Sequence, residues 1–127
     1  MTGVTVLDQT SNGKLTPTLW GLLILLQVWA SELLWSVTNL EAVGTGADRL
    51  YEIEASESAI PFEALLDLIE GVNQVIDGEF IGRSRTGAIM MTIRAVDSTA
   101  FDVEAFDPRV AELVESSFKQ TRRFSTT

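Results

Sequence analysis

The chain contains neither cysteine nor histidine. Without cysteine it can form no disulfide and offers no thiol nucleophile, and without histidine it lacks the most frequent acid–base group and metal ligand. Zinc fingers, and haem or copper sites with their usual ligands, are excluded as well. A catalytic site would have to use carboxylates, Lys, Arg, Ser, Thr or the one Tyr. We therefore expect a protein that is not an enzyme and that holds no cofactor and no metal.

Basic residues are also scarce, since 9 Lys and Arg stand against 18 Asp and Glu, for a formal charge of −9. The imbalance lies in one stretch, because residues 41–82 hold ten of the acids and a single base, Arg49. A negative field of this kind repels phosphate backbones and attracts basic proteins. We expect no nucleic-acid binding through the acidic part of the chain, and a basic protein as its partner.

Length and hydrophobicity are typical of one folded domain. With 46% apolar residues and a mean hydropathy of +0.20, the chain is too apolar for a disordered protein. A chain of this length buries about two thirds of its unfolded surface without disulfides or metals. We expect a single α+β domain over residues 17–119. Residues 1–16 are predicted to be a flexible arm or one short edge strand, and residues 120–127 a polar, basic tail.

The strongest periodic signal lies between Pro17 and Leu40, which we predict to form one helix. Apolar residues recur there at the spacing of one helical face. The residues of that face are Leu19, Leu22, Leu23, Leu26, Ala30, Leu33, Leu34 and Val37. The opposite side is apolar too, with Ile24, Val28 and Trp35. A helix that is apolar nearly all round has to be covered on both sides.

Three explanations of this apolar helix compete. A transmembrane span is disfavoured because the uncharged run covers only residues 15–31, is interrupted by Pro17 and Gly21, and lacks a basic flank. A signal peptide is disfavoured because Asp8 precedes the apolar run and Lys14 is the only base before it. We expect the helix to lie across a sheet with its second side covered by protein, in a cytoplasmic protein that does not bind membranes.

Alternating and amphipathic patterns predict the remaining elements. In chain order they are a strand at Arg49–Ala55, a helix at Pro61–Ile76, strands at Phe80–Ile81, Ala88–Val96 and Ala100–Phe106, and a helix from Pro108 to Phe118. Asp107 before Pro108 is typical of a helix start, since the carboxylate caps the first turn and proline fits its first position. The order α-β-α-β-β-β-α predicts a two-layer α+β domain with three helices and a mainly antiparallel sheet of about four strands.

Charged side chains on the predicted strands allow two interpretations. Arg94 lies in an apolar strand, and we expect it to form an ion pair across the hairpin with Asp102 or Glu104. A sugar-cleaving carboxylate pair could be drawn from these two acids together with Glu52 and Glu54. The alternation of the predicted strands points all four to solvent, however, which is typical of a solvated face rather than of a catalytic site.

Charge and apolar surface are the features left to indicate a function. We expect a protein-binding module that neutralises a basic partner through an acidic face, as an inhibitor, an immunity protein or an antitoxin would. The acids predicted to contact that partner are Glu52, Glu54, Glu63, Asp67, Glu70 and Glu79. The alternative is a structural or assembly subunit, a homo-oligomer or part of a larger complex, that uses the Trp-rich first helix as its interface. Its predicted contact residues are Trp35, Ile24 and Val28.

Overall fold

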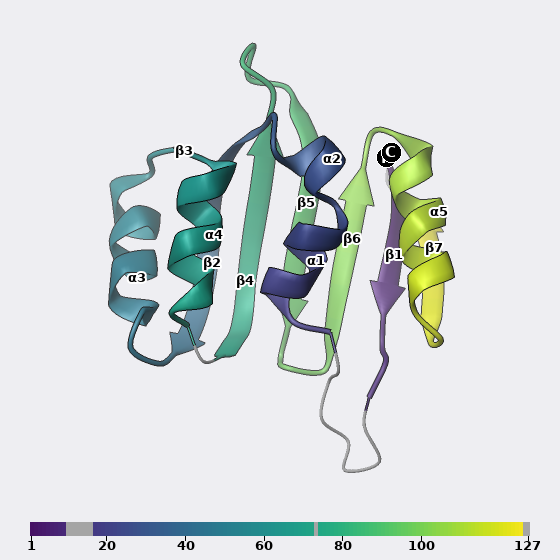
Figure 1. The fold of residues 1–127 in the computed structure, drawn as a ribbon, viewed down its shortest axis with the longest axis horizontal. Coiled ribbons are helices and arrows are strands. Elements are labelled where there is room, and N and C mark those ends of the chain that lie inside the picture. Colours follow the sequence, from purple (N-terminus) through teal and green to yellow (C-terminus); the bar gives the residue numbers. More distant parts are fainter. Residues whose placement is uncertain (10–16, 73, 126–127) are drawn as a thin grey trace.

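A computed structural model describes residues 1–9, 17–72 and 74–125 of the chain. Within them the protein is an α+β fold with one antiparallel sheet of seven strands and five helices (Figure 1). The strands are β1 (Thr2–Val6), β2 (Leu34–Val43), β3 (Ile60–Pro61), β4 (Gln74–Arg83), β5 (Ile89–Val96), β6 (Ala100–Ala105) and β7 (Thr121–Ser125). The helices are α1 (Leu19–Leu25), α2 (Gln27–Ala30), α3 (Ala47–Ser56), α4 (Phe62–Glu70) and α5 (Pro108–Ser117).

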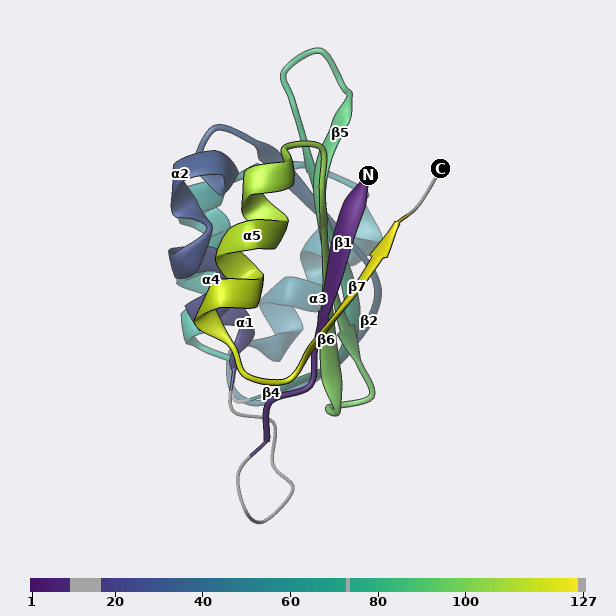
Figure 2. The ribbon, with the colours of Figure 1, turned by 90° about the vertical axis from the view of Figure 1, so that its right-hand side faces the viewer.

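The strands follow the order β3-β2-β4-β5-β6-β1-β7 across the sheet. Helices α1, α2, α4 and α5 lie on one face of the sheet, whereas α3 lies beside the outer edge of β2 (Figures 1 and 2). No described helix covers the opposite face, which we call the open face. The prediction of about four strands and three helices is therefore wrong in the number and in the order of the elements.

The predicted helix Pro17–Leu40 is divided into α1, α2 and β2. The chain becomes a strand where the apolar pattern changes period, because Trp35 and Val37 are buried while the residues between and after them are not. The indole Nε1–H of Trp35 donates to the carbonyl of Ala30 at 3.0 Å, so it satisfies an acceptor at the end of α2. Leu33, Leu34 and Val37 also continue the helical spacing of Leu26 and Ala30, so the sequence pattern predicted a helix here instead.

The predicted strand Arg49–Ala55 is helix α3. Ala47 and Leu50 are buried three residues apart, and Ile53 packs against the core another three residues on, which is the spacing of a helical face. The apparent alternation of Tyr51 and Ile53 was too short to separate the two periods.

Both ends of the described chain belong to the sheet. β1 pairs with β6 on one side and with β7 on the other, so it is an interior strand rather than an arm or an edge. Part of the predicted tail forms β7, the edge strand. Residues 10–16 and 126–127 of the predicted arm and tail lie outside the described residues. The expected helix Pro61–Ile76 ends at Glu70, because β4 already begins at Gln74.

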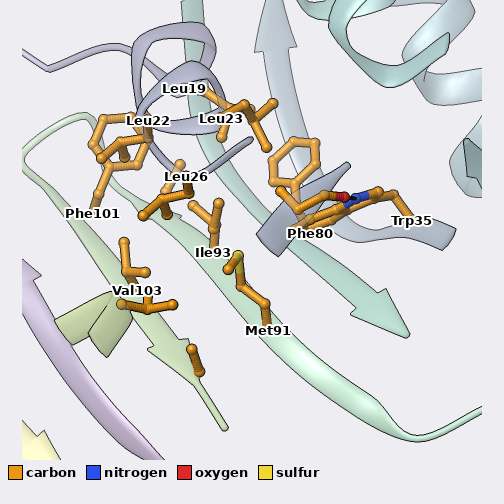
Figure 3. Close-up of a cluster of buried hydrophobic side chains, with 14 of the residues drawn as sticks. Leu19, Leu22, Leu23, Leu26, Trp35, Phe80, Met91, Ile93, Phe101 and Val103 are labelled. Atoms are coloured by element: carbon orange, nitrogen blue, oxygen red, sulfur yellow. Dashed lines mark hydrogen bonds between the residues drawn. The ribbon is translucent and has the colours of Figure 1, made fainter. Parts of the chain in front are cut away.

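The core lies between the sheet and the helices that cover it (Figure 3). One registered row, fully or almost fully buried, crosses five strands of the sheet. Its members are Val37, Phe80, Ile93, Val103 and Val4. Leu19, Leu22, Leu23 and Leu26 face this side of the sheet from α1 and its C-terminal end. Side chains of opposite parity on the same strands therefore point to the open face.

Candidate functional site

Helices α3 and α4, with the residue that caps the C-terminus of α3, present a group of exposed carboxylates that we call the acidic surface. Its members are Asp48, Glu52, Glu57, Glu63, Asp67 and Glu70. α4 buries Phe62, Leu65 and Ile69 against the protein, so its acids necessarily fall on the outer side. α3 contacts α4 and lies next to it (Figure 1), which brings the acids of both helices onto the same end of the molecule.

The carboxylates of the acidic surface are not neutralised by neighbouring side chains. Each ion pair between described residues involves other acids, and Arg49 is the only base within α3 and α4. Like charges at this spacing on α4, such as Glu63 and Asp67, destabilise a helix by a few tenths of a kcal/mol. Helix stability therefore does not explain the acidic surface, and its field extends into solvent over about one Debye length.

Glu54 was predicted to contact a partner, but the structure gives it a bond within the fold. Its carboxylate accepts the backbone N–H of Leu40 at 2.6 Å. Beside it, the Tyr51 hydroxyl accepts the N–H of Ala42 at 2.9 Å and lies 3.4 Å from the carbonyl of the same residue. β3 pairs only with Leu34 and Trp35, so these α3 side chains bind the part of the β2 edge that β3 leaves open.

Glu79, another predicted contact residue, lies away from the acidic surface on the open face. Its carboxylate accepts from Arg94 Nε at 2.8 Å, and the Arg94 guanidinium also bonds to Glu104. Burial lowers the pKa of Arg94, but the hydrogen bonds to Glu104 and Glu79 more than offset this, and the pKa lies above its ordinary value. Glu104 is only 6% exposed.

The expected cross-hairpin ion pair of Arg94 is thus confirmed for Glu104 and not for Asp102. Asp102 instead accepts a hydrogen bond from the hydroxyl of Thr5 at 2.6 Å. The expectation that both acids are solvated is wrong for Glu104, which is buried on the open face. Sequence reasoning missed Glu79 as a partner of Arg94, because it ended the preceding helix at Ile76 and began the strand only at Phe80.

The three residues of the predicted Trp-rich interface are separated by the fold. Trp35 is fully buried in β2 and cannot contact a partner in the folded protein. Ile24 is half-buried on α1, and only Val28 on α2 is freely presented, at 74% exposure.

A pocket that the sequence did not suggest lies beside Val28. It has a volume of about 240 Å³, is open to solvent, and is lined by α2 with the residues after it, by β5, and by the segment that joins β6 to α5. Its lining residues are Val28, Trp29, Glu32, Leu33, Met90, Met91, Ala105, Phe106, Asp107 and Val110. Phe106 is 71% exposed, so Phe106 and Val28 both expose apolar side chains to solvent beside the pocket. The three segments meet only through tertiary packing, which leaves no local sequence signal.

The rim of the pocket is polar and carries both signs of charge. Asp107 caps α5 by accepting the N–H of Arg109 at 2.9 Å, and its Oδ2 pairs with Nη2 of the same arginine at 2.7 Å. These bonds from Arg109 lower the pKa of Asp107 to about 2. The Arg109 guanidinium lies 6.0 Å from the centre of the Trp29 ring. Glu32 is exposed and forms no ion pair with another described residue.

No protein-family model, curated protein or solved structure matches the chain. In the described ranges, no helix is both long and apolar enough to cross a membrane. Within the same ranges, no group of three or more acids is arranged to hold a metal ion.

Proposed function

We propose that the protein is a non-enzymatic binding module that recognises a basic protein partner through the acidic surface, as an inhibitor, immunity protein or antitoxin does. The observation that carries the proposal is that six exposed carboxylates, five on two adjacent helices and one at the C-cap of α3, form no ion pair with another described residue. Such a field steers an oppositely charged protein and raises its association rate. We further propose a cytoplasmic location, where a cysteine-free fold needs no disulfides.

The packed helices fix the backbone positions from which these carboxylates project, which supports recognition over a general role in solubility. Phe62, Leu65 and Ile69 anchor α4, and Leu50 anchors α3. The bonds from Tyr51 and Glu54 to β2 add a polar attachment of α3 to the sheet. Backbone that is already ordered loses little conformational entropy on binding, so charges spaced along it can favour one complementary partner over other cations.

The test compares two triple variants that lose the same charge. The first replaces acids of the acidic surface, as Glu63→Gln, Asp67→Asn and Glu70→Gln. The control replaces exposed acids elsewhere, as Glu41→Gln, Asp97→Asn and Glu112→Gln. Immobilised wild-type protein and both variants are used to capture proteins from cells of the source organism. Each captured protein is then purified, and its affinity for the wild type and for both variants is measured by titration.

We expect a basic protein to bind the wild type and the control variant with similar affinity and to bind the acidic-surface variant at least about tenfold more weakly. The affinity should also fall as salt rises from low to physiological concentration. Equal loss of binding in both variants would indicate that only net charge matters. That result, or binding that does not respond to salt, contradicts the proposal.

A further inference from the structure

We propose that the pocket between α2, β5 and the start of α5 is a docking site for one apolar side chain that stands next to Lys or Arg in a segment of a protein partner. The inference rests on the proposed function, because it takes the partner to be basic. It adds a second contact region, at α2 and the start of α5 rather than at α3 and α4, and it names the side chains that this region recognises.

The lining of the pocket indicates an apolar occupant. Trp29, Leu33 and Met90 line it and are half-buried, so each keeps apolar surface in contact with water. Val28 and Phe106 stand at its mouth and are 74% and 71% exposed. A side chain placed there removes water from both the lining and the mouth, and aromatic residues in such pockets are typical of energetically dominant contacts.

The size of the pocket favours a single side chain over a larger ligand. Its volume of about 240 Å³ lies below the roughly 300–1,000 Å³ of sites that enclose drug-sized molecules or cofactors. Protein interfaces, by contrast, commonly use small pockets that receive one anchor residue of the partner. We therefore expect the occupant to be a side chain of leucine or phenylalanine size.

Charge around the pocket indicates a basic residue beside the apolar one. Arg109 engages Asp107 in an ion pair, whereas Glu32 on the same rim forms none with another residue of the described chain. Glu32 is therefore the group that an incoming cation would meet. A net charge of −9 also repels a second copy of the protein, so charge complementarity favours a basic partner as the occupant.

The test is a titration of ¹⁵N-labelled protein with capped dipeptide amides, followed by NMR. The probes are N-acetyl-Leu-Arg-amide, N-acetyl-Leu-Glu-amide and N-acetyl-Gly-Arg-amide. We expect the first to shift the Trp29 indole signal and the backbone signals of Ala105, Phe106 and Asp107. The Leu-Glu probe should bind about threefold to tenfold more weakly, since it exchanges an exposed attraction for a repulsion. The Gly-Arg probe should leave the pocket signals unchanged.

Matched variants assign the binding to the pocket. Val28→Ser and Phe106→Ser should each weaken binding of the Leu-Arg probe by about fivefold, because each removes apolar contact area. Val43→Ser and Val96→Ser replace exposed valines outside the pocket and should have no effect. All four side chains are exposed, so dispersed amide spectra are expected throughout. Glu32→Gln should reduce the preference for Leu-Arg over Leu-Glu.

Several outcomes would overturn the inference. The first is that the Leu-Arg probe causes no shift of the pocket signals. The second is that Val28→Ser and Val43→Ser weaken binding of this probe equally. The third is that dilution of the protein alone shifts the pocket signals, which would identify a second copy as the occupant. The acidic-surface variant separates this inference from the proposed function, because it should bind the dipeptide like the wild type. If a partner binds through the acidic surface and its affinity is the same for the wild type and the pocket variants, the pocket inference fails and the proposed function stands.

Discussion

Replacement of Arg94 by methionine tests the charge network of the open face. The Arg94 guanidinium joins Glu79 on β4 to Glu104 on β6 and thereby links three adjacent strands. Arg94→Met keeps an apolar chain of similar length but removes both bonds. Glu104, which is 6% exposed, then loses its bond to the Arg94 guanidinium.

The magnitude follows from burial. Removing one partner of a fully buried ion pair costs about 3–5 kcal/mol. The side chain of Arg94 is 34% exposed, so water screens the pair in part, and we expect Arg94→Met to lower the free energy of unfolding by about 2–3 kcal/mol. Glu79 is 29% exposed, and Glu79→Gln should cost less than about 1 kcal/mol.

Urea unfolding followed by circular dichroism measures these differences in free energy. Thermal unfolding should show a decrease in Tm of roughly 8–12 °C for Arg94→Met. Glu104→Gln in the Arg94→Met background should recover about half of the loss, since it removes the charge that Arg94 compensated. A cost below about 0.5 kcal/mol for Arg94→Met, or a double variant no more stable than the single one, would refute the reasoning.

Three further predictions concern stability. A Cβ at Gly46 would lie 2.7 Å from the carbonyl carbon of Gly71, whereas one at Gly71 would lie 3.6 Å from its nearest neighbour. Gly46→Ala should therefore cost about 2 kcal/mol in urea unfolding and Gly71→Ala less than about 0.5, and equal costs would contradict this. Ser98 has a φ of 57°, and relief of that strain should outweigh the loss of the exposed hydrogen bond that its hydroxyl accepts from Gln74 Nε2. Ser98→Gly should therefore raise the unfolding free energy by about 0.5 kcal/mol, and any loss would count against it. Because the pKa of Asp107 falls from 3.8 to about 2 on folding, its ion pair with Arg109 stabilises the protein above pH 4 and stops doing so as the pH falls to 2. The Tm difference between wild type and Asp107→Asn should shrink over that interval, and a constant difference would exclude the ion pair as its cause.

Elements with local start signals could be predicted from the sequence. Asp107 accepts from the N–H of Arg109, and α5 begins at Pro108, as the cap predicted. β5 and β6 also occupy the predicted ranges to within a residue, because their apolar residues alternate over six or more positions. The exposure of the α4 acids followed directly from the apolar stripe on the opposite side of that helix.

Residues whose role depends on tertiary contacts could not be placed in this way. Trp35 is apolar, and its position on a helix surface or in a core depends on the β2 assignment. Glu54 is acidic, and its bond to Leu40 exists only because α3 lies beside β2. The pocket required segments around residues 28, 90 and 106 to meet, and no spacing in the sequence records that meeting.

The sequence pattern predicts a helix up to Leu40 and a strand at Arg49–Ala55, whereas the structure has strand β2 and helix α3 there. One physical cause connects these two errors. Once Leu34–Val43 is a strand, its outer backbone groups need partners, and β3 supplies them only at Leu34 and Trp35. Further along, the side chains of Tyr51 and Glu54 bind the N–H groups of Ala42 and Leu40. They can do so because α3 is a helix and places residues three apart on one side. The backbone hydrogen bonds of β2 therefore depend on α3, so the two segments have to be predicted together. Apolar periodicity treats each segment alone and cannot detect this dependence.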